Sequence, residues 1–236
     1  MLTCAERFNI AEVLEELKSY RVENTVALVT RSEPEVFPAY GEERFHVAMM
    51  DYGVKQHMIE CLRKRGCRVT ALPASTPAEA VLAGGYDGVM LSNGPGDPAE
   101  NTAIIEELKK LYASDIPLFG VCLGHQLLAL ATGARTGRLA YGHRGGNHPV
   151  RDVEKGRVFI TSQNHGYMVL ADSVDPAVAE VSHINVNDGT CEGLRYQRPN
   201  CFTTQFHPEA NAGPKDTEYL FNRFIDNMAA KKGGAQ

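Results

Sequence analysis

The stretch Ile116-Pro117-Leu118-Phe119-Gly120-Val121-Cys122-Leu123-Gly124 is an apolar run that ends at a cysteine with a glycine two residues to each side. A helix-like stretch, Leu127-Leu128-Ala129-Leu130-Ala131, follows it. Strand, sharp turn and helix in this order are typical of a nucleophile elbow, with sulfur in place of a serine oxygen. Gly120 and Gly124 fit such a turn because a Cβ would clash where backbone and strands approach. Although an isolated cysteine is more often a core residue, this setting predicts that Cys122 is a nucleophile whose thiolate is favoured by the helix N-terminus.

A second motif supplies a base for this thiolate. Phe202-Thr203-Thr204-Gln205-Phe206 is typical of a buried strand, and it runs into His207-Pro208-Glu209. Because proline disfavours the α region for the preceding residue, His207 is expected to be extended, and residues two apart then project to the same side. Glu209 is thus predicted to hold the imidazole and support its positive charge, as in a catalytic triad. We predict that Cys122, His207 and Glu209 are catalytic residues that meet in one pocket.

The third motif is the loop Leu91-Ser92-Asn93-Gly94-Pro95-Gly96-Asp97-Pro98. Two glycines and two prolines in so short a span indicate a rigid backbone path. At the end of a strand, such a loop can direct backbone N–H groups at a ligand oxygen. Together with the N–H of Leu123 it is predicted to form an oxyanion hole. The loop matches neither of the common phosphate-binding glycine motifs.

Alternating strand and helix signals predict the fold class. Strands are expected over 46–51, 67–72 and 87–91, and helices over 54–65, 77–83 and 100–113. This alternation predicts an α/β domain with a mainly parallel sheet and helices on both faces. Shorter strands and turns over 147–205 predict a small antiparallel extension that returns His207 to the carboxyl ends of the parallel strands, where ligands bind in such sheets.

The expected domain boundaries follow from the same patterns. Residues 1–44 are predicted to be a leading segment with a helix over 9–20 capped by Asn9, a strand over 25–30 and a linker over 33–43. The main domain is expected over 45–230 and ends in an amphipathic helix over 216–230. Residues 231–236 are expected to be a disordered tail.

Composition excludes several classes of function. The net charge of −5 and the pI near 5.9 argue against a nucleic-acid-binding surface. Six cysteines without a C-x-x-C pair and eight scattered histidines argue for a reducing, cytoplasmic setting and against a metal site. We find neither a signal peptide nor the roughly 18 consecutive apolar residues of a membrane span, so no membrane association is expected.

The motifs around Cys122, Gly94–Gly96 and His207–Glu209, in this order, resemble class I (triad-type) glutamine amidotransferases. Gly145-Gly146-Asn147-His148-Pro149-Val150 and Gln163-Asn164-His165-Gly166 are similar to the small, glutaminase subunits of carbamoyl-phosphate synthetases within that family. The resemblance runs from about 45 to 226 and implies hydrolysis of L-glutamine through a thioester on Cys122, with His207 as acid and base and Glu209 as its orienting partner. It also implies a set of glutamine-binding residues: Gly94, Gly96, Leu123, Gln126, Asn164, Gly166 and Tyr167.

The same resemblance implies a partner. In this family the ammonia passes to a large ATP-dependent synthetase subunit, which makes carbamoyl phosphate for arginine and pyrimidine biosynthesis. No cofactor is expected in this chain, and ATP and Mg belong to the large subunit. Small subunits of the family begin with a further domain, and residues 1–44 resemble only the connector that follows it, so that domain is expected to be missing here.

Three other functions stay open at this point. The chain is alternatively the glutaminase component of another amidotransferase, such as anthranilate synthase, which shares the triad. It is alternatively a Cys–His hydrolase or peptidase built on a related sheet. The third alternative is a truncated, non-catalytic regulatory subunit, against which the three filled triad positions argue.

Overall fold

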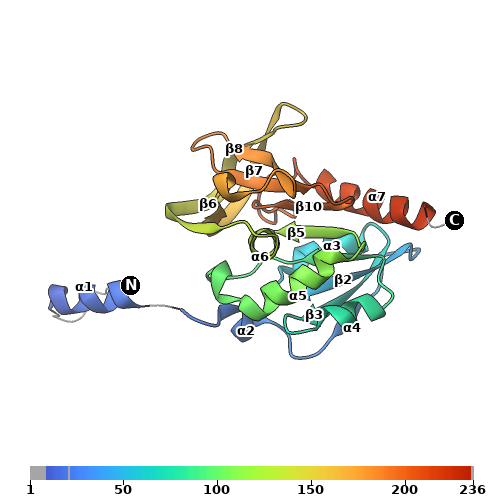
Figure 1. The fold of residues 1–236 in the computed structure, drawn as a ribbon, viewed down its shortest axis with the longest axis horizontal. Coiled ribbons are helices and arrows are strands. Elements are labelled where there is room, and N and C mark those ends of the chain that lie inside the picture. Colours follow the sequence, from blue (N-terminus) through green and yellow to red (C-terminus); the bar gives the residue numbers. More distant parts are fainter. Residues whose placement is uncertain (1–8, 21, 235–236) are drawn as a thin grey trace.

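A single mixed sheet organises the computed structural model, which describes residues 9–20 and 22–234. The ten strands follow the spatial order β1-β3-β2-β4-β5-β10-β9-β8-β6-β7 (Figure 1). The strands are β1 (Glu35–Phe37), β2 (Phe45–Asp51), β3 (Cys67–Pro73), β4 (Gly88–Leu91), β5 (Leu118–Val121), β6 (Thr136–Asp152), β7 (Arg157–Val169), β8 (Ala179–Asn185), β9 (Cys191–Tyr196) and β10 (Cys201–Thr204). The predicted α/β class is confirmed.

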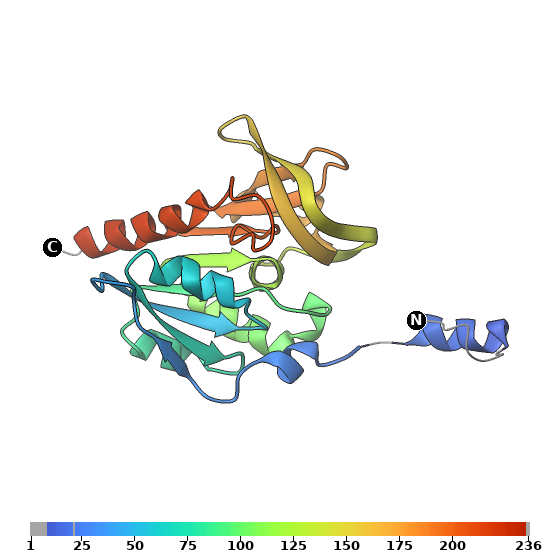
Figure 2. The same cartoon turned by 180° about the vertical axis from the view of Figure 1, so that it is seen from behind.

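Helices cover both faces of the parallel part of the sheet. They are α2 (Thr25–Val29), α3 (Gln56–Arg63), α4 (Ala78–Ala83), α5 (Thr102–Ala113), α6 (Leu123–Ala131) and α7 (Tyr219–Gly233). A further helix, α1 (Ile10–Ser19), has no buried residues, and η1 (Pro98–Glu100) and η2 (Ala171–Ser173) are short 3-10 turns. Buried residues of α2, α4, α5 and α6 form one core cluster, and those of α3 and α7 form the other. Helices α4 and α5 face the viewer in Figure 1, and α3 and α7 do so in Figure 2.

Parallel pairing joins β3, β2, β4, β5 and β10. Along β2 the side chains alternate between the two cores, since Val47 and Met49 pack with α3 and α7 while Ala48 and Met50 pack with α4 to α6. This alternation is the period-two geometry of a strand that is buried on both faces. The parallel arrangement brings the carboxyl ends of β4 and β5 to the same edge of the sheet. The 91–98 loop follows β4 there, and Cys122 follows β5.

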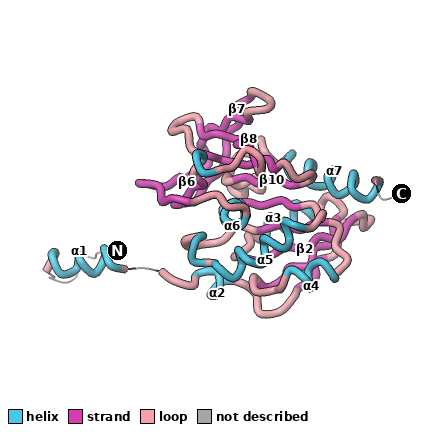
Figure 3. Tube along the Cα trace, in the orientation of Figure 1, coloured by secondary structure: helices cyan, strands magenta, loops and turns pink. Residues whose placement is uncertain are grey.

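The antiparallel part of the sheet is more extensive than the sequence indicated. It begins at Thr136 rather than at 147, and β6 and β7 form a long hairpin that rises above β10 (Figure 3). Register shifts occur between Arg138 and His143 and between Gly145 and His148. Such irregularities, with positive φ at Gly142 and Gly145, disturb the alternating pattern by which a strand is recognised in sequence.

The amino-terminal segment agrees with the sequence only in part. Helix α1 begins after Asn9, whose side chain accepts a hydrogen bond from the Ala11 N–H, as predicted. The strand predicted over 25–30 is wrong, because these residues form α2 with Val26 buried. A short apolar run does not distinguish a helix from a strand by periodicity alone. In both views α1 lies apart from the sheet (Figures 1 and 2).

Two further boundaries differ from expectation. The predicted linker over 33–43 contains β1, which lies at the edge of the sheet and pairs antiparallel with β3. Helix α7 runs to Gly233, so residues 231–233 of the expected tail are helical. Residues 1–8 of the leading segment and 235–236 of the tail lie outside the described residues. Among the described helices, none combines the length and apolar character that crossing a bilayer requires.

Candidate active site

Cys122 occupies a strained turn between β5 and α6. Its φ of 54° and ψ of −104° lie outside the regions that non-glycine residues favour, and it is the N-cap of α6. A Cβ on Gly124 would meet the Leu91 carbonyl, and one on Gly120 would lie 2.9 Å from the Gly124 carbonyl oxygen. The glycines on each side of the cysteine are therefore needed for close approach, as the sequence indicated. Of the first N–H groups of α6, that of Gly124 donates to the Ser92 carbonyl at 3.0 Å, which leaves the N–H of Leu123 without an intrahelical acceptor and able to reach a ligand.

Pairing between β5 and β10 brings the histidine to this turn. The two strands are parallel with Val121 opposite Thr204, and the Cys122 N–H donates to the Thr204 carbonyl at 2.8 Å. Three residues later, the His207 N–H donates to the Ser162 carbonyl of β7 at 2.9 Å. His207 is thus fixed between β7 and the elbow.

His207 and Glu209 form a buried pair. The His207 Nδ1–H donates to Glu209 Oε1 at 2.7 Å, and each residue is 2 % exposed. Burial lowers the pKa of His207, but the neighbouring Cys122 and the Glu209 carboxylate outweigh it and raise this pKa to about 10. Burial raises the pKa of Glu209, yet the charge and hydrogen bond of His207 bring it below its usual value. The arrangement favours an imidazolium beside the cysteine sulfur.

Lys55 is a functional candidate that the sequence did not reveal. Its Nζ lies 3.3 Å from Glu209 Oε1, and its positive charge also lowers the pKa of Glu209. The Lys55 N–H donates to Asn93 Oδ1 at 3.0 Å, which ties the segment before α3 to the 91–98 loop. Lys55 is not part of any sequence motif found above, so only the tertiary structure identifies it as a candidate functional residue.

A cavity of about 260 Å³ opens beside the pair. It is lined by Gly53, Lys55, Asn93, Gly94, Pro95, Cys122, Asn164 and His207. Of the predicted glutamine-binding residues, Gly94 and Asn164 therefore share a cavity with the predicted nucleophile and base. A Cβ on Gly94 would meet the Tyr52 carbonyl, which explains the glycine at this place in the wall.

Three more of the predicted residues lie in an adjoining cavity. Gly96, Gly166 and Tyr167 line a space of about 790 Å³, together with residues of α1, the β6 segment and the 96–100 loop. Burial and the nearby Asp97 carboxylate raise the pKa of Tyr167. Five of the seven predicted residues are thus divided between two spaces.

The last two predicted residues are buried in α6. Leu123 is 1 % exposed and Gln126 is 3 % exposed. Gln126 Nε2 donates to the Tyr167 carbonyl at 2.8 Å and to Gln205 Oε1 at 2.9 Å. The Gln126 side chain therefore supports the strand that carries Asn164 and Tyr167, while Leu123 offers its backbone N–H at the start of the helix.

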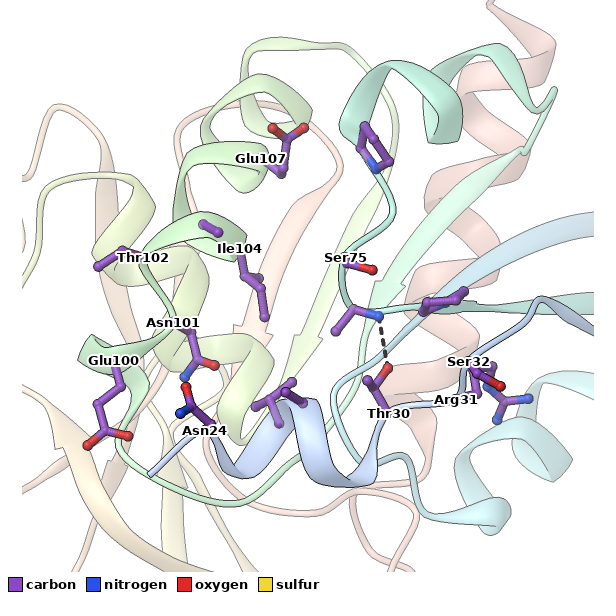
Figure 4. A pocket seen from close by; sticks show the side chains of 16 residues that line it. Asn24, Thr30, Arg31, Ser32, Ser75, Glu100, Asn101, Thr102, Ile104 and Glu107 are labelled. Atoms are coloured by element: carbon purple, nitrogen blue, oxygen red, sulfur yellow. Dashed lines mark hydrogen bonds between the residues drawn. The ribbon is translucent and has the colours of Figure 1, made fainter. Parts of the chain in front are cut away.

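A third cavity, of about 680 Å³, lies between α2, the end of β3 and the start of α5 (Figure 4). Polar side chains such as Asn24, Asn101 and Glu107 line it, and the Ala74 N–H donates to Thr30 Oγ1 at its wall. None of the predicted site residues is among the described residues that line it. This space does not share the chemistry of the Cys122 site.

The chain matches the family described as glutamine amidotransferase class-I over residues 48–227. The carbamoyl phosphate synthase small chain of Fusobacterium nucleatum is 48% identical over 220 residues, which are 93% of this chain and 61% of that protein. The small chain of Symbiobacterium thermophilum is 46% identical over 217 residues, 92% of this chain and 59% of the relative. That of Listeria monocytogenes serotype 4b is 45% identical over 234 residues, covering 99% and 63%.

These relatives are longer than this chain, which spans 59% to 63% of their length. Among solved structures, the chain is similar to a protein from Thermoplasma acidophilum that is described as a component of GMP synthase. The TM-score is 0.70 at 20% identity, covering 81% of this chain and 98% of that one. At this identity the likeness supports the fold alone.

Proposed function

Because this chain belongs to the class I glutamine amidotransferase family, we propose that it hydrolyses the side-chain amide of L-glutamine to glutamate and ammonia at Cys122. The observation that carries the proposal is the single cavity in which Cys122 and His207 meet, with Glu209 hydrogen-bonded behind the imidazole. A thiolate, an imidazole that gives and then takes a proton, and an orienting carboxylate are the parts that nucleophilic acyl transfer requires.

The first half of the reaction transfers the acyl group to sulfur. The Cys122 thiolate attacks the carboxamide carbon, and the electron pair of the C=O bond moves to oxygen. The N–H of Leu123 at the start of α6 and the N–H groups of the Gly94 loop are the donors nearest to this oxyanion. His207 then gives its proton to the nitrogen, the C–N bond breaks, and ammonia leaves behind a γ-glutamyl thioester.

The second half returns the enzyme to its starting state. Neutral His207 takes a proton from water while the water oxygen attacks the thioester carbon. The tetrahedral intermediate collapses, the C–S bond breaks, and glutamate leaves while Cys122 is restored as a thiolate beside the imidazolium. Glu209, with Lys55 as its counter-charge, supports the positive charge on His207 in both halves.

Substrate recognition rests on the walls described above. We assign Gly94 and Asn164 to the reacting amide, and Gly96, Gly166 and Tyr167 to the amino-acid end of glutamine in the adjoining space. Gln126 acts through the Tyr167 carbonyl that it holds, and so is a positioning residue.

We further propose that the ammonia is delivered to a large ATP-dependent synthetase subunit for carbamoyl phosphate synthesis. The small-chain relatives at 45% to 48% identity support this role over that of another amidotransferase component. ATP and Mg would act on that partner, the products would serve arginine and pyrimidine biosynthesis, and the setting would be the cytoplasm.

The decisive experiment measures ammonia and glutamate release from L-glutamine by the purified chain, with and without a large subunit from a relative. Glutamine-dependent release that Cys122→Ala abolishes supports the glutaminase. Stimulation by the large subunit, together with carbamoyl phosphate formed from glutamine, supports the partnership. Release from peptide or ester substrates but not from glutamine would instead support a hydrolase, and no release with any substrate would support a regulatory role.

A further inference from the structure

Two histidines and a glutamate meet inside the antiparallel part of the sheet, away from the triad. His143 of β6 pairs directly with His165 of β7, and Glu192 of β9 packs against them. One potential ligand atom from each of the three lies within 4.8 Å of the others. His143 is 8% exposed, His165 is 6% exposed and Glu192 is fully buried. The sequence separates these residues widely and predicted no metal site.

Each of the three side chains also forms a hydrogen bond with a group outside the cluster. His143 Nε2 lies 2.8 Å from Asp188 Oδ2, and His165 Nδ1 lies 2.8 Å from the Tyr167 carbonyl. A carboxylate only accepts, so Nε2 of His143 carries a hydrogen and its Nδ1, which has no hydrogen-bond partner, has the lone pair in the neutral ring. The Tyr167 carbonyl likewise favours a hydrogen on Nδ1 of His165. Glu192 Oε1 accepts from Asn185 Nδ2 at 3.0 Å. Metal-ligating side chains in proteins are oriented by outer partners of this kind.

The remaining side-chain nitrogen and oxygen atoms of the three residues lie close to one another. Glu192 Oε2 is buried and has no hydrogen-bond partner. His143 Nδ1 lies 3.3 Å from Glu192 Oε1, close to the separation of about 3.3 Å between tetrahedral ligands that are each about 2.0 Å from zinc. His165 Nε2 lies 2.8 Å from Gln163 Oε1, and an ion bound to this nitrogen takes the place of that hydrogen bond.

We propose that His143, His165 and Glu192 bind one divalent ion of the zinc class. Two imidazole nitrogens and one carboxylate oxygen suit Zn²⁺ and its first-row neighbours, whereas Mg²⁺ and Ca²⁺ prefer oxygen ligands throughout. An unpartnered carboxylate oxygen in the interior is costly, and a cation relieves that cost. The ion joins β6, β7 and β9 behind Asn164, which lines the small cavity.

A proton on His143 competes with the metal ion for binding to this cluster. When His143 is protonated it forms ion pairs with both Asp188 and Glu192. Zinc must displace this proton, so its binding releases a proton.

The test is a metal titration of the full chain in a Cys122→Ala background, which removes the active-site thiolate as a competing ligand. Zn²⁺ is titrated against a chromophoric chelator, and Co²⁺ is added separately so that its absorption spectrum reports the coordination geometry. We expect one ion per chain, a higher Tm with Zn²⁺ than with Mg²⁺, and no Co²⁺–thiolate absorption.

Three variants locate the ion. His143→Ala and Glu192→Gln should each weaken Zn²⁺ binding by about 100-fold or more, and Asp188→Asn by about 10- to 100-fold. His148→Ala is the matched control, because its ring lies 5.2 Å from that of His143 but it is not one of the three donors. This control should bind as the background does.

Any of three results would overturn the site: no stoichiometric Zn²⁺ binding by the background protein, binding that survives in Glu192→Gln, or binding that is lost in His148→Ala. Glu192→Gln decides the matter if His143→Ala does not fold, because it preserves the shape of the side chain and an oxygen for Asn185. The titration requires no glutamine hydrolysis, so its outcome is independent of the proposed function.

Discussion

The backbone N–H of Cys122 donates a hydrogen bond of 2.8 Å to the carbonyl oxygen of Thr204. This bond extends the parallel pairing of β5 with β10 by one residue, and His207 follows three residues after Thr204. Two motifs from distant parts of the chain therefore meet because two short strands are neighbours in one sheet. The predictions below depend on that junction.

Replacement of the predicted nucleophile removes the reaction. Cys122→Ala should abolish ammonia release from glutamine without loss of the fold, because the variant removes only the sulfur from a side chain in the cavity wall. Circular dichroism and an ammonia assay check both parts. Cys67→Ala, a buried cysteine outside that cavity, is the control and should keep its activity. Continued release by Cys122→Ala would exclude a thioester mechanism at this residue.

Glu209 should affect turnover more than binding. Glu209→Gln keeps the size of the side chain but removes the charge that supports the His207 imidazolium, so kcat should fall by about 10²- to 10⁴-fold with a small change in KM. Steady-state kinetics with glutamine measure both values. The exposed Glu106→Gln on α5 is the matched control. A rise in KM with unchanged kcat would make Glu209 a binding residue.

The charge of Lys55 should set the acid limb of the pH–rate profile. Burial raises the pKa of Glu209, while His207 and then Lys55 lower it. Lys55→Met removes one of the two positive charges, so the pKa of Glu209 rises and activity is lost at a higher pH on acidification. The exposed Lys64→Met at the opposite end of α3 should leave the profile unchanged. An acid limb that does not move would show that Lys55 has no influence on Glu209.

The ionisation of His207 should depend on Cys122. The pKa of His207 is raised from 6.5 to about 10, with Cys122 as the first of the groups that raise it against burial. Stability from the protonated ring is full below pH 6.5 and is lost as pH rises through about 10. In Cys122→Ala the pKa should therefore fall, and the loss of stability should move to lower pH. Imidazole NMR titration of both proteins measures this, and equal values would refute the coupling.

Packing at the elbow should not tolerate a methyl group. Gly124→Ala places a Cβ against the Leu91 carbonyl and should lower the free energy of unfolding by about 1–3 kcal/mol, with reduced activity. Gly233→Ala at the end of α7 adds the same group where nothing lies within 4 Å, and should be neutral. Urea denaturation of the two variants gives the comparison. Equal stability would show that the elbow can relax.

Local patterns in the sequence predicted the structural features that depend on residues close together in the chain. Proline at 208 makes the preceding residue extended, and the contact of His207 with Glu209 follows from that. The glycines around Cys122 marked the turn, and the alternation of strands and helices predicted the parallel sheet. The short apolar run at 25–29 gave a wrong prediction, because so short a run does not distinguish a helix from a strand by its periodicity, and only Val26 of the helix is buried.

The sequence by itself thus determined the α/β class, the strained turn at Cys122 and the His207–Glu209 pair, since each rests on chain geometry over a few residues. Only the tertiary structure decided that Lys55 faces Glu209, that five of the predicted glutamine residues are divided between two cavities, and that His143, His165 and Glu192 meet. These contacts depend on strand order and register in the sheet. Pairing energies between distant segments set that order, and no short stretch of sequence records it.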